Sequence, residues 1–309
     1  MKILNITDTL PAATTVATIG MFDGVHLGHQ TLLMALKRVA GDRRLRTLVV
    51  TFRQHPQQVL KPGTDLRMIT TVDDKLTLLD ASGIDYCLLL DFTPELAAHE
   101  SIDFMRLLHD RFGVSALITG YNHHFGHNRN ETFLDYVAGG KQVGLEVLKA
   151  PEYLGKYAPV SSSIIRKLIA SGKVDDARRC MGRPYRLEGT VVQGFHNGRG
   201  IGFPTANLGK TDPTVILPHN GAYAVMVNLE NGRRLKGMVN VGVRPTLHNG
   251  PQLTVEVNIF DFDADIYGQR LSLDFIRFLR LEYKLGSIEE LRQQLTRDRE
   301  HSKRYLEKF

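Results

Sequence analysis

The order of β-rich runs and helical patterns in the first half of the chain limits the fold more than any other feature. The β-rich runs lie at residues 15–20, 47–51, 86–90 and 115–119, and helical patterns lie at 29–40, 72–81 and 102–111. Because successive strands joined through helices make right-handed crossovers, this alternation predicts a parallel, doubly wound sheet. Ligands of such sheets bind at the carboxyl ends of the strands. Functional residues are therefore expected in the turns that follow strands.

The pattern changes after Pro151. Two helical stretches, 161–170 and 174–180, end at a Gly-Arg-Pro break at 182–184. From 185 to 278 the segments mostly alternate polar and apolar residues, which predicts an antiparallel barrel or sandwich, and residues 287–309 have the spacing of one long helix. We therefore expect an α/β domain over 1–182, including the linker helices, and a β domain over 183–309.

Composition excludes several classes of protein. Cys87 and Cys180 lie far apart and match neither a disulfide framework nor a zinc-ligand spacing, so we expect reduced thiols in a cytoplasmic protein. The first residues lack the apolar core of a signal peptide, and no apolar run reaches about 18 residues. No membrane partner is therefore expected.

The net charge of +6 raises the question of nucleic acid. The basic residues are scattered or interleaved with acidic ones, as on solvated helix faces. No nucleic-acid partner is expected, because a small polyanion such as ATP explains the charge equally well. The sequence does not give the oligomeric state, and we expect a monomer or a weak homo-oligomer.

The first candidate site is the turn at residues 20–30, between the first long strand and its helix. Gly20, Gly24 and Gly28 let the backbone approach a ligand, and the helix N-terminus offers free amide groups to phosphate. His26 and His29 are three residues apart and would share one face of the first turn. Such a turn can hold a triphosphate, although a tight turn with two surface histidines is the simpler alternative.

A second candidate lies at the start of the predicted helix 161–170. Ser162 and Ser163 would open this helix, and Arg166 would lie one turn along it. Hydroxyl groups, amide groups and a guanidinium would then converge on phosphate. A serine-rich helix cap followed by a surface arginine is the alternative.

The third candidate is a glycine-rich stretch that can wrap phosphates, although it could also be a plain hairpin. Its constrained positions are Gly194, Gly198, Gly200, Gly202 and Pro204. The Thr205 hydroxyl and the Asn207 amide oxygen suit Mg²⁺, which takes oxygen ligands. Farther along, Glu256 shares one face of an alternating strand with Thr254 and Asn258.

The first turn resembles the phosphate-binding signature of the nucleotidyltransferase superfamily, specifically its prokaryotic FAD synthetase branch. It is neither the dinucleotide fingerprint nor a P-loop. Residues 160–166 resemble the family's SST-x-x-R motif, with Ser163 where Thr is usual. The resemblance implies nucleotide or phosphate contacts for Gly20, Phe22, Asp23, Gly24, Gly28, Ser162 and Ser163, and catalytic roles for His26, His29 and Arg166.

Residues 202–207 resemble the riboflavin kinase signature, whose Thr and Asn bind the ATP-associated metal; here these are Thr205 and Asn207. That family places its catalytic glutamate in the strand that holds Glu256, and its flavin pocket near Arg280. The matching segments follow the family's order over nearly the whole chain. The sequence is therefore identified as a member of the prokaryotic bifunctional riboflavin kinase/FMN adenylyltransferase (FAD synthetase) family.

This resemblance implies a Rossmann-like nucleotidyltransferase domain followed by an antiparallel β-barrel kinase domain with a terminal helix. It also implies that riboflavin is phosphorylated to FMN and that FMN is adenylylated to FAD, with ATP as co-substrate, Mg²⁺ as cofactor and pyrophosphate as the second product. Two alternatives stay open. One is a monofunctional riboflavin kinase with a degenerate nucleotide-binding first domain, and the other is a flavin-binding regulatory protein.

Residues 120–129 resemble the family's flavin-and-nucleotide loop but depart from its usual pattern. Related synthetases have Asp-Phe-Arg-Phe-Gly where this chain has Asn122, His123, His124, Phe125 and Gly126, followed by Arg129. Asn122 loses the charge of Asp, and His124 replaces a permanently charged guanidinium with a group that is mostly neutral at pH 7. Adenylyl transfer is nevertheless expected to be retained, because the histidine turn and Arg166 remain.

If His124 supplies the missing cation, FAD formation relative to FMN formation should be greater near pH 6 than near pH 8, because imidazole gains its charge in this range. His124→Arg should flatten that dependence. Chromatographic separation of the flavins made by one enzyme preparation measures the ratio. An unchanged pH dependence in the variant would contradict this role of His124.

Overall fold

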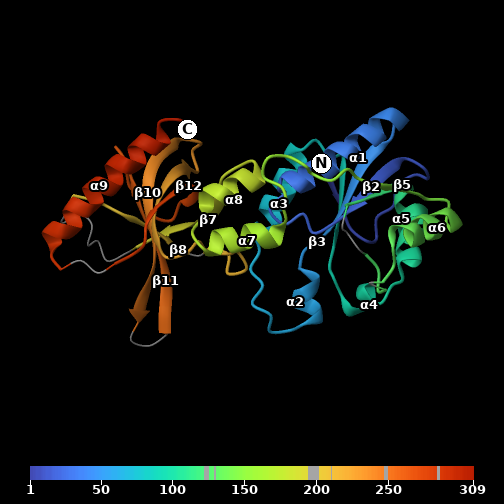
Figure 1. The fold of residues 1–309 in the computed structure, drawn as a ribbon, viewed down its shortest axis with the longest axis horizontal. Helices are drawn as coiled ribbons and strands as arrows, with labels where there is room; N and C mark the ends of the chain where they lie inside the picture. Colours follow the sequence, from blue (N-terminus) through green and yellow to red (C-terminus); the bar gives the residue numbers. More distant parts are fainter. Residues whose placement is uncertain (122–124, 129, 194–201, 210, 247–249, 284–285) are drawn as a thin grey trace. The chain divides into compact units, whose positions relative to one another are not determined.

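The computed structural model describes residues 1–121, 125–128, 130–193, 202–209, 211–246, 250–283 and 286–309 (Figure 1). Contacts divide the chain into two compact units, one of residues 1–66 and 70–161 and the other of residues 67–69 and 162–309. The linker helices α7 (Ser162–Ala170) and α8 (Val174–Met181) thus group with the second unit. The domain boundary at Gly182 stays a prediction.

The first unit is built on a parallel sheet, as the sequence predicted. Within the described residues its strands follow the order β1-β4-β3-β2-β5-β6. Their bounds are β1 Lys2–Leu4, β2 Thr15–Ile19, β3 Arg46–Phe52, β4 Tyr86–Leu90, β5 Val114–Thr119 and β6 Glu146–Lys149. The chain runs outward from β2 through β3 to β4 and then crosses back to place β5 on the other side of β2. The carboxyl ends of β2 and β5 therefore flank the position where such sheets bind ligands.

Helices cover both faces of this sheet. Helices α1 (Leu27–Arg43) and α3 (Val72–Ala81) share one buried cluster with Val16, whereas α5 (Ser101–Phe112) and α6 (Phe133–Gln142) share the other with Ala17 and Ile19. Two short helices, α2 (Pro56–Leu60) and α4 (Pro94–Ala97), follow β3 and β4. Because β2 is buried on both faces, it is apolar or hydrogen-bonded throughout.

The second unit is a closed barrel, which decides between the barrel and the sandwich that the alternating pattern allowed. Within the described residues the strand order is β10-β11-β8-β7-β12-β9. The bounds are β7 Tyr185–Val192, β8 Ala206–Gly209, β9 Gly221–Leu229, β10 Arg234–Thr246, β11 Gly250–Ile259 and β12 Arg270–Arg280. The predicted terminal helix is present as α9 (Ile288–Leu306), and the Ser287 hydroxyl caps its first turn.

Opposite faces of the barrel strands pack differently. Tyr185, Tyr223 and Phe275 share the interior, and the Phe275 ring centre lies 5.7 Å from that of Tyr185 and 5.2 Å from that of Tyr223. On the outer face, Met226 and Met238 belong to a cluster that includes Leu306 of α9. The helix therefore covers the outside of the strands (Figure 1).

Gly113 offers a test of the first unit's packing. It joins α5 to β5 with φ at 60°, and an added Cβ would lie 1.9 Å from the Pro11 carbonyl oxygen. Gly113→Ala should destabilise the unit by about 2–4 kcal/mol and lower its melting temperature in calorimetry. Gly41→Ala, at a helical site where the Cβ meets nothing, should stabilise α1 by up to about 1 kcal/mol. Equal melting of the two variants would contradict the prediction.

Candidate active sites

The turn after β2 has a strained and closely fitted backbone. Phe22, Gly24 and Val25 all have positive φ values, of 50°, 80° and 35°. At Gly28 an added Cβ would lie 3.2 Å from the His26 ring, and at Gly20 it would lie 3.2 Å from the Phe22 ring. An added Cβ would therefore crowd these rings, which favours glycine at both positions.

The two histidines of this turn lie together at the N-terminus of α1. His26 is the N-cap residue, and its Nδ1 accepts a hydrogen bond of 3.3 Å from the His29 backbone N–H. The two imidazole rings stack with centres 3.7 Å apart, and the centre of the Phe22 ring lies 5.1 Å from that of the His29 ring. The structure thus brings both predicted histidines to the helix end that attracts phosphate.

Hydrogen bonds fix the turn to its neighbours in the first unit. The buried Asp23 carboxylate accepts the Thr70 backbone N–H at 3.2 Å, and the Thr70 hydroxyl accepts the Gly24 N–H at 3.1 Å. The Thr51 hydroxyl at the end of β3 donates to the Met21 carbonyl at 3.1 Å. Asp23 therefore supports the turn through its side chain.

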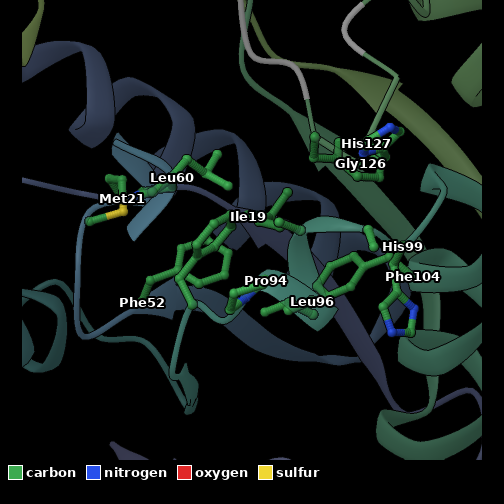
Figure 2. Close-up of a pocket in the computed structure, with 15 residues that line it drawn as sticks. Ile19, Met21, Phe52, Leu60, Pro94, Leu96, His99, Phe104, Gly126 and His127 are labelled. Carbon is green, nitrogen blue, oxygen red and sulfur yellow. The ribbon is translucent and has the colours of Figure 1, made fainter. Parts of the chain in front are cut away.

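A cavity of about 420 Å³ opens beside the carboxyl ends of β2, β3 and β4. Its walls are mainly apolar, and Figure 2 shows Phe52, Pro94, Leu96 and Phe104 around it, with Gly126 and His127 approaching from a separate loop. A cavity of this size and character suits a planar aromatic ligand.

Phe125, which the sequence placed in the flavin loop, lines this cavity and is buried. The Tyr136 hydroxyl holds it by accepting the Phe125 N–H at 3.2 Å and donating to the Phe125 carbonyl at 3.1 Å. The two rings stack 4.5 Å apart. The structure therefore fixes Phe125 firmly at the cavity wall.

Ser162 begins α7 and is half-buried, Ser163 is exposed, and Arg166 lies one turn along from Ser162. This helix belongs to the second unit, whereas the histidine turn belongs to the first. Six further predicted residues lie outside the described residues: Asn122, His124, Arg129, Gly194, Gly198 and Gly200.

The second site is set by strand register in the barrel. Asn207 lies opposite Glu256, Glu256 opposite Asn240, Asn240 opposite Ala222, and Ala222 opposite Arg280. Residues that lie opposite one another in antiparallel strands project from the same face. Four polar side chains therefore follow one line across the outer face, and the small Ala222 leaves room among them.

A cavity of about 220 Å³ lies on this face, between the strands and α9. Thr205, Glu256 and Arg280 line it, and Asp298 of α9 holds the Arg280 guanidinium through contacts of 2.8 and 2.9 Å. The Arg280 guanidinium also lies 4.9 Å from the centre of the Tyr283 ring. The arginine is thus fixed in orientation by a buried carboxylate.

Thr205 also lines a smaller cavity of about 90 Å³, which Pro204, Asp263 and Tyr267 border. The Pro204 carbonyl accepts a hydrogen bond of 2.7 Å from the Asn258 amide, so β11 holds the backbone just before Thr205. Gly202 nearby has φ at 80° and is exposed. Thr205 therefore lines two neighbouring cavities.

Two family models match the chain. The FAD synthetase model covers residues 10–164, and the riboflavin kinase model covers residues 181–306. Among curated relatives, a bifunctional riboflavin kinase/FMN adenylyltransferase of Listeria monocytogenes is 32% identical over 98% of this chain and 96% of the relative. The enzyme of the same name from Haemophilus influenzae is 33% identical over 94% of this chain and 93% of the relative. The chain belongs to this family.

A solved structure from Streptococcus pneumoniae has the same fold, with a TM-score of 0.90 and 29% identity over 98% of this chain and 99% of that one. That structure is named a macrolide-efflux protein, a name that belongs to the other protein. In the part of the chain that the structure describes, no helix combines the length and apolar character needed to cross a membrane. The family that the sequence predicted is confirmed by the family models and curated relatives.

Some residues of both sites were not predicted. Met21, Phe92 and Leu96 line the first cavity, and Asn240 and Asp298 line the second. Asn240 carried a signal, because it is a polar residue in an alternating strand. Only the register, however, shows that it lies beside Glu256.

Proposed function

We propose that this chain makes FAD in two steps, phosphorylating riboflavin in the second unit and adenylylating FMN in the first. The observation that carries the proposal is the pair of matches to FAD synthetase and riboflavin kinase, which fall on the two units that hold the two separate sites. ATP is the co-substrate of both steps, and the flavins are the substrates and products. No nucleic-acid partner, a cytoplasmic location and a monomeric or weakly oligomeric state stay predictions from the sequence.

In the kinase step, Glu256 is the general base that accepts the proton of the ribityl hydroxyl as the hydroxyl oxygen attacks the γ-phosphorus of ATP and ADP leaves. Its place in a cavity with Thr205 and Arg280 supports this role. Flavin in the larger cavity and nucleotide in the smaller one would meet at Thr205.

Thr205 and Asn207 offer the hydroxyl and amide oxygens that Mg²⁺ accepts, and Asn207 lies opposite Glu256. These oxygens fit the metal, which when bound offsets phosphate charge. Among the described residues, no group of three or more His, Cys, Asp and Glu side chains is arranged to hold a metal ion. Mg²⁺ usually takes few protein ligands beside phosphate oxygens and water, so two protein oxygens are consistent with this metal.

In the second step, the FMN phosphate attacks the α-phosphorus of ATP and pyrophosphate leaves. The reaction needs positioning and charge stabilisation and no protein nucleophile. We assign phosphate binding to the α1 N-terminus with His26 and His29. The phosphate contacts of Ser162, Ser163 and Arg166, which the family resemblance implies, stay predictions from the sequence. The apolar cavity with Phe52 and Phe125 would hold the isoalloxazine ring.

Incubation with riboflavin, ATP and Mg²⁺, followed by separation of the flavins, tests both steps. FAD is the expected product, whereas FMN alone would favour the monofunctional kinase and no product would favour the regulatory protein.

Glu256→Gln should lower FMN formation by about 10²- to 10⁴-fold and leave FAD formation from added FMN intact. His29→Ala should have the reverse effect. Near-normal FMN formation by Glu256→Gln would show that Glu256 is not the general base.

Tyr136→Phe should weaken the flavin site of the first unit alone. It removes the hydroxyl that pairs with both backbone groups of Phe125, a change of about 1 kcal/mol that corresponds to about a fivefold higher KM for FMN. Tyr305→Phe, which alters an exposed tyrosine of α9, serves as the control. The KM for FMN of both variants is measured from steady-state rates of FAD formation. An unchanged KM in Tyr136→Phe would contradict the assignment of this cavity to flavin binding.

A further inference from the structure

Lys75 of α3 is a buried cation that the reactions described so far do not use. The residue is only 3% exposed, and its Nζ donates a hydrogen bond of 2.6 Å to the Phe52 carbonyl at the end of β3. Lysine is rarely buried to this extent without a partner. The groups around Lys75 therefore indicate the role of its ammonium group.

Asp23 is the acidic residue whose charge acts on Lys75. It is 1% exposed in the turn after β2, and its negative charge favours the protonated lysine. From β4, Lys75 is faced by Cys87, and burial raises the pKa of this thiol to about 11, so it is neutral near pH 8. On α3 itself, the Asp74 carboxylate accepts the Thr71 hydroxyl.

The two groups that Lys75 contacts or attracts belong to the two halves of the candidate adenylylation site. Asp23 lies in the turn that carries His26, and the side chain of Phe52 lines the apolar cavity. We propose that Lys75 is a positioning residue for adenylyl transfer. Its ammonium group donates to the Phe52 carbonyl, and its charge attracts the buried Asp23 carboxylate, so that the phosphate-binding turn and the flavin cavity keep one spacing. This inference rests on the proposed function.

Charge gives Lys75 a second effect on the same step. The triphosphate of ATP is strongly anionic, and Asp23 would repel it from within the turn if its charge were not offset. Lys75 supplies that offset from a site that is only 3% exposed, where the interaction is poorly screened by solvent. A neutral side chain at position 75 would leave a buried carboxylate beside the bound phosphates.

The pH dependence follows from burial. Desolvation lowers the pKa of Lys75 from 10.5 to about 8, although Asp23 opposes that shift. The ammonium group is therefore present below pH 8 and is lost as the pH rises above it. FAD formation from added FMN should fall above pH 8, while FMN formation by the second unit in the same preparation should not follow this fall.

The test compares Lys75→Met, Lys75→Arg and the wild type in both reactions from pH 6.5 to 9.5. Lys75→Met should lower kcat/KM for FMN adenylylation by about 10- to 100-fold at pH 7 and remove the fall above pH 8. Lys75→Arg should restore activity and keep it above pH 8, because guanidinium stays charged. Lys37→Met is the matched control, because the exposed Lys37 also donates to a carbonyl, that of Ser82 at 2.9 Å, and its loss should change neither reaction.

Adding Asp23→Asn to Lys75→Met removes the uncompensated charge and should recover adenylylation at least about threefold over Lys75→Met alone. The double variant removes both buried charges together, so neither is left uncompensated, and it is expected to fold. FMN formation and circular dichroism monitor the folded state of each variant. The proposal is overturned by wild-type FAD formation in Lys75→Met, by a retained fall above pH 8 in either Lys75 variant, or by no recovery in the double variant. A wild-type chain that makes FMN but no FAD overturns both this inference and the proposed second step.

Discussion

A strand buried on both faces can offer polar backbone groups only where it ends, and the first unit is arranged around this constraint at β2. All five residues of β2 are buried between helices, so the chain becomes available to a ligand only at its carboxyl end. There the backbone takes positive φ values and starts α1 with His26 as its cap. The turn can be so strained because Thr51 and Thr70 anchor it through hydrogen bonds.

In the barrel, polar groups of the candidate site are side chains on the outer face of the strands rather than backbone groups at a strand end. Its strands have one apolar face inside, so polar side chains are collected on the outer face, and the register decides which of them meet. Asn207, Glu256 and Asn240 come from three strands and lie in one row only because each pairs directly with the next. A register shift of one residue would move Glu256 to the interior and destroy the site.

The fold class and the order of the motifs could be predicted from sequence, since alternation, turns and local spacing carry them. Helix α6 was not predicted, and its residues explain why. Gly139 and Gly140 weaken helix propensity, yet an added Cβ at Gly140 would lie 2.5 Å from the Leu145 carbonyl oxygen, so close packing requires glycine there. The cavities and the barrel register also depend on contacts distant in sequence. No local pattern could place Asp298 against Arg280 or Lys75 against Phe52.

The two units also treat buried charge differently. In the barrel, the buried carboxylates of Asp274 and Asp298 are paired with Arg186 and Arg280, whose guanidinium groups keep their charge at every pH that the protein encounters. In the first unit, the charge of the buried Asp23 is opposed by that of a lysine, Lys75. Burial lowers the pKa of Lys75 to about 8, so this lysine loses its charge at a pH at which arginine keeps its own. Two steps that share ATP and FMN would therefore respond unequally to pH, and the ratio of FMN to FAD would be set by the electrostatics of the first unit.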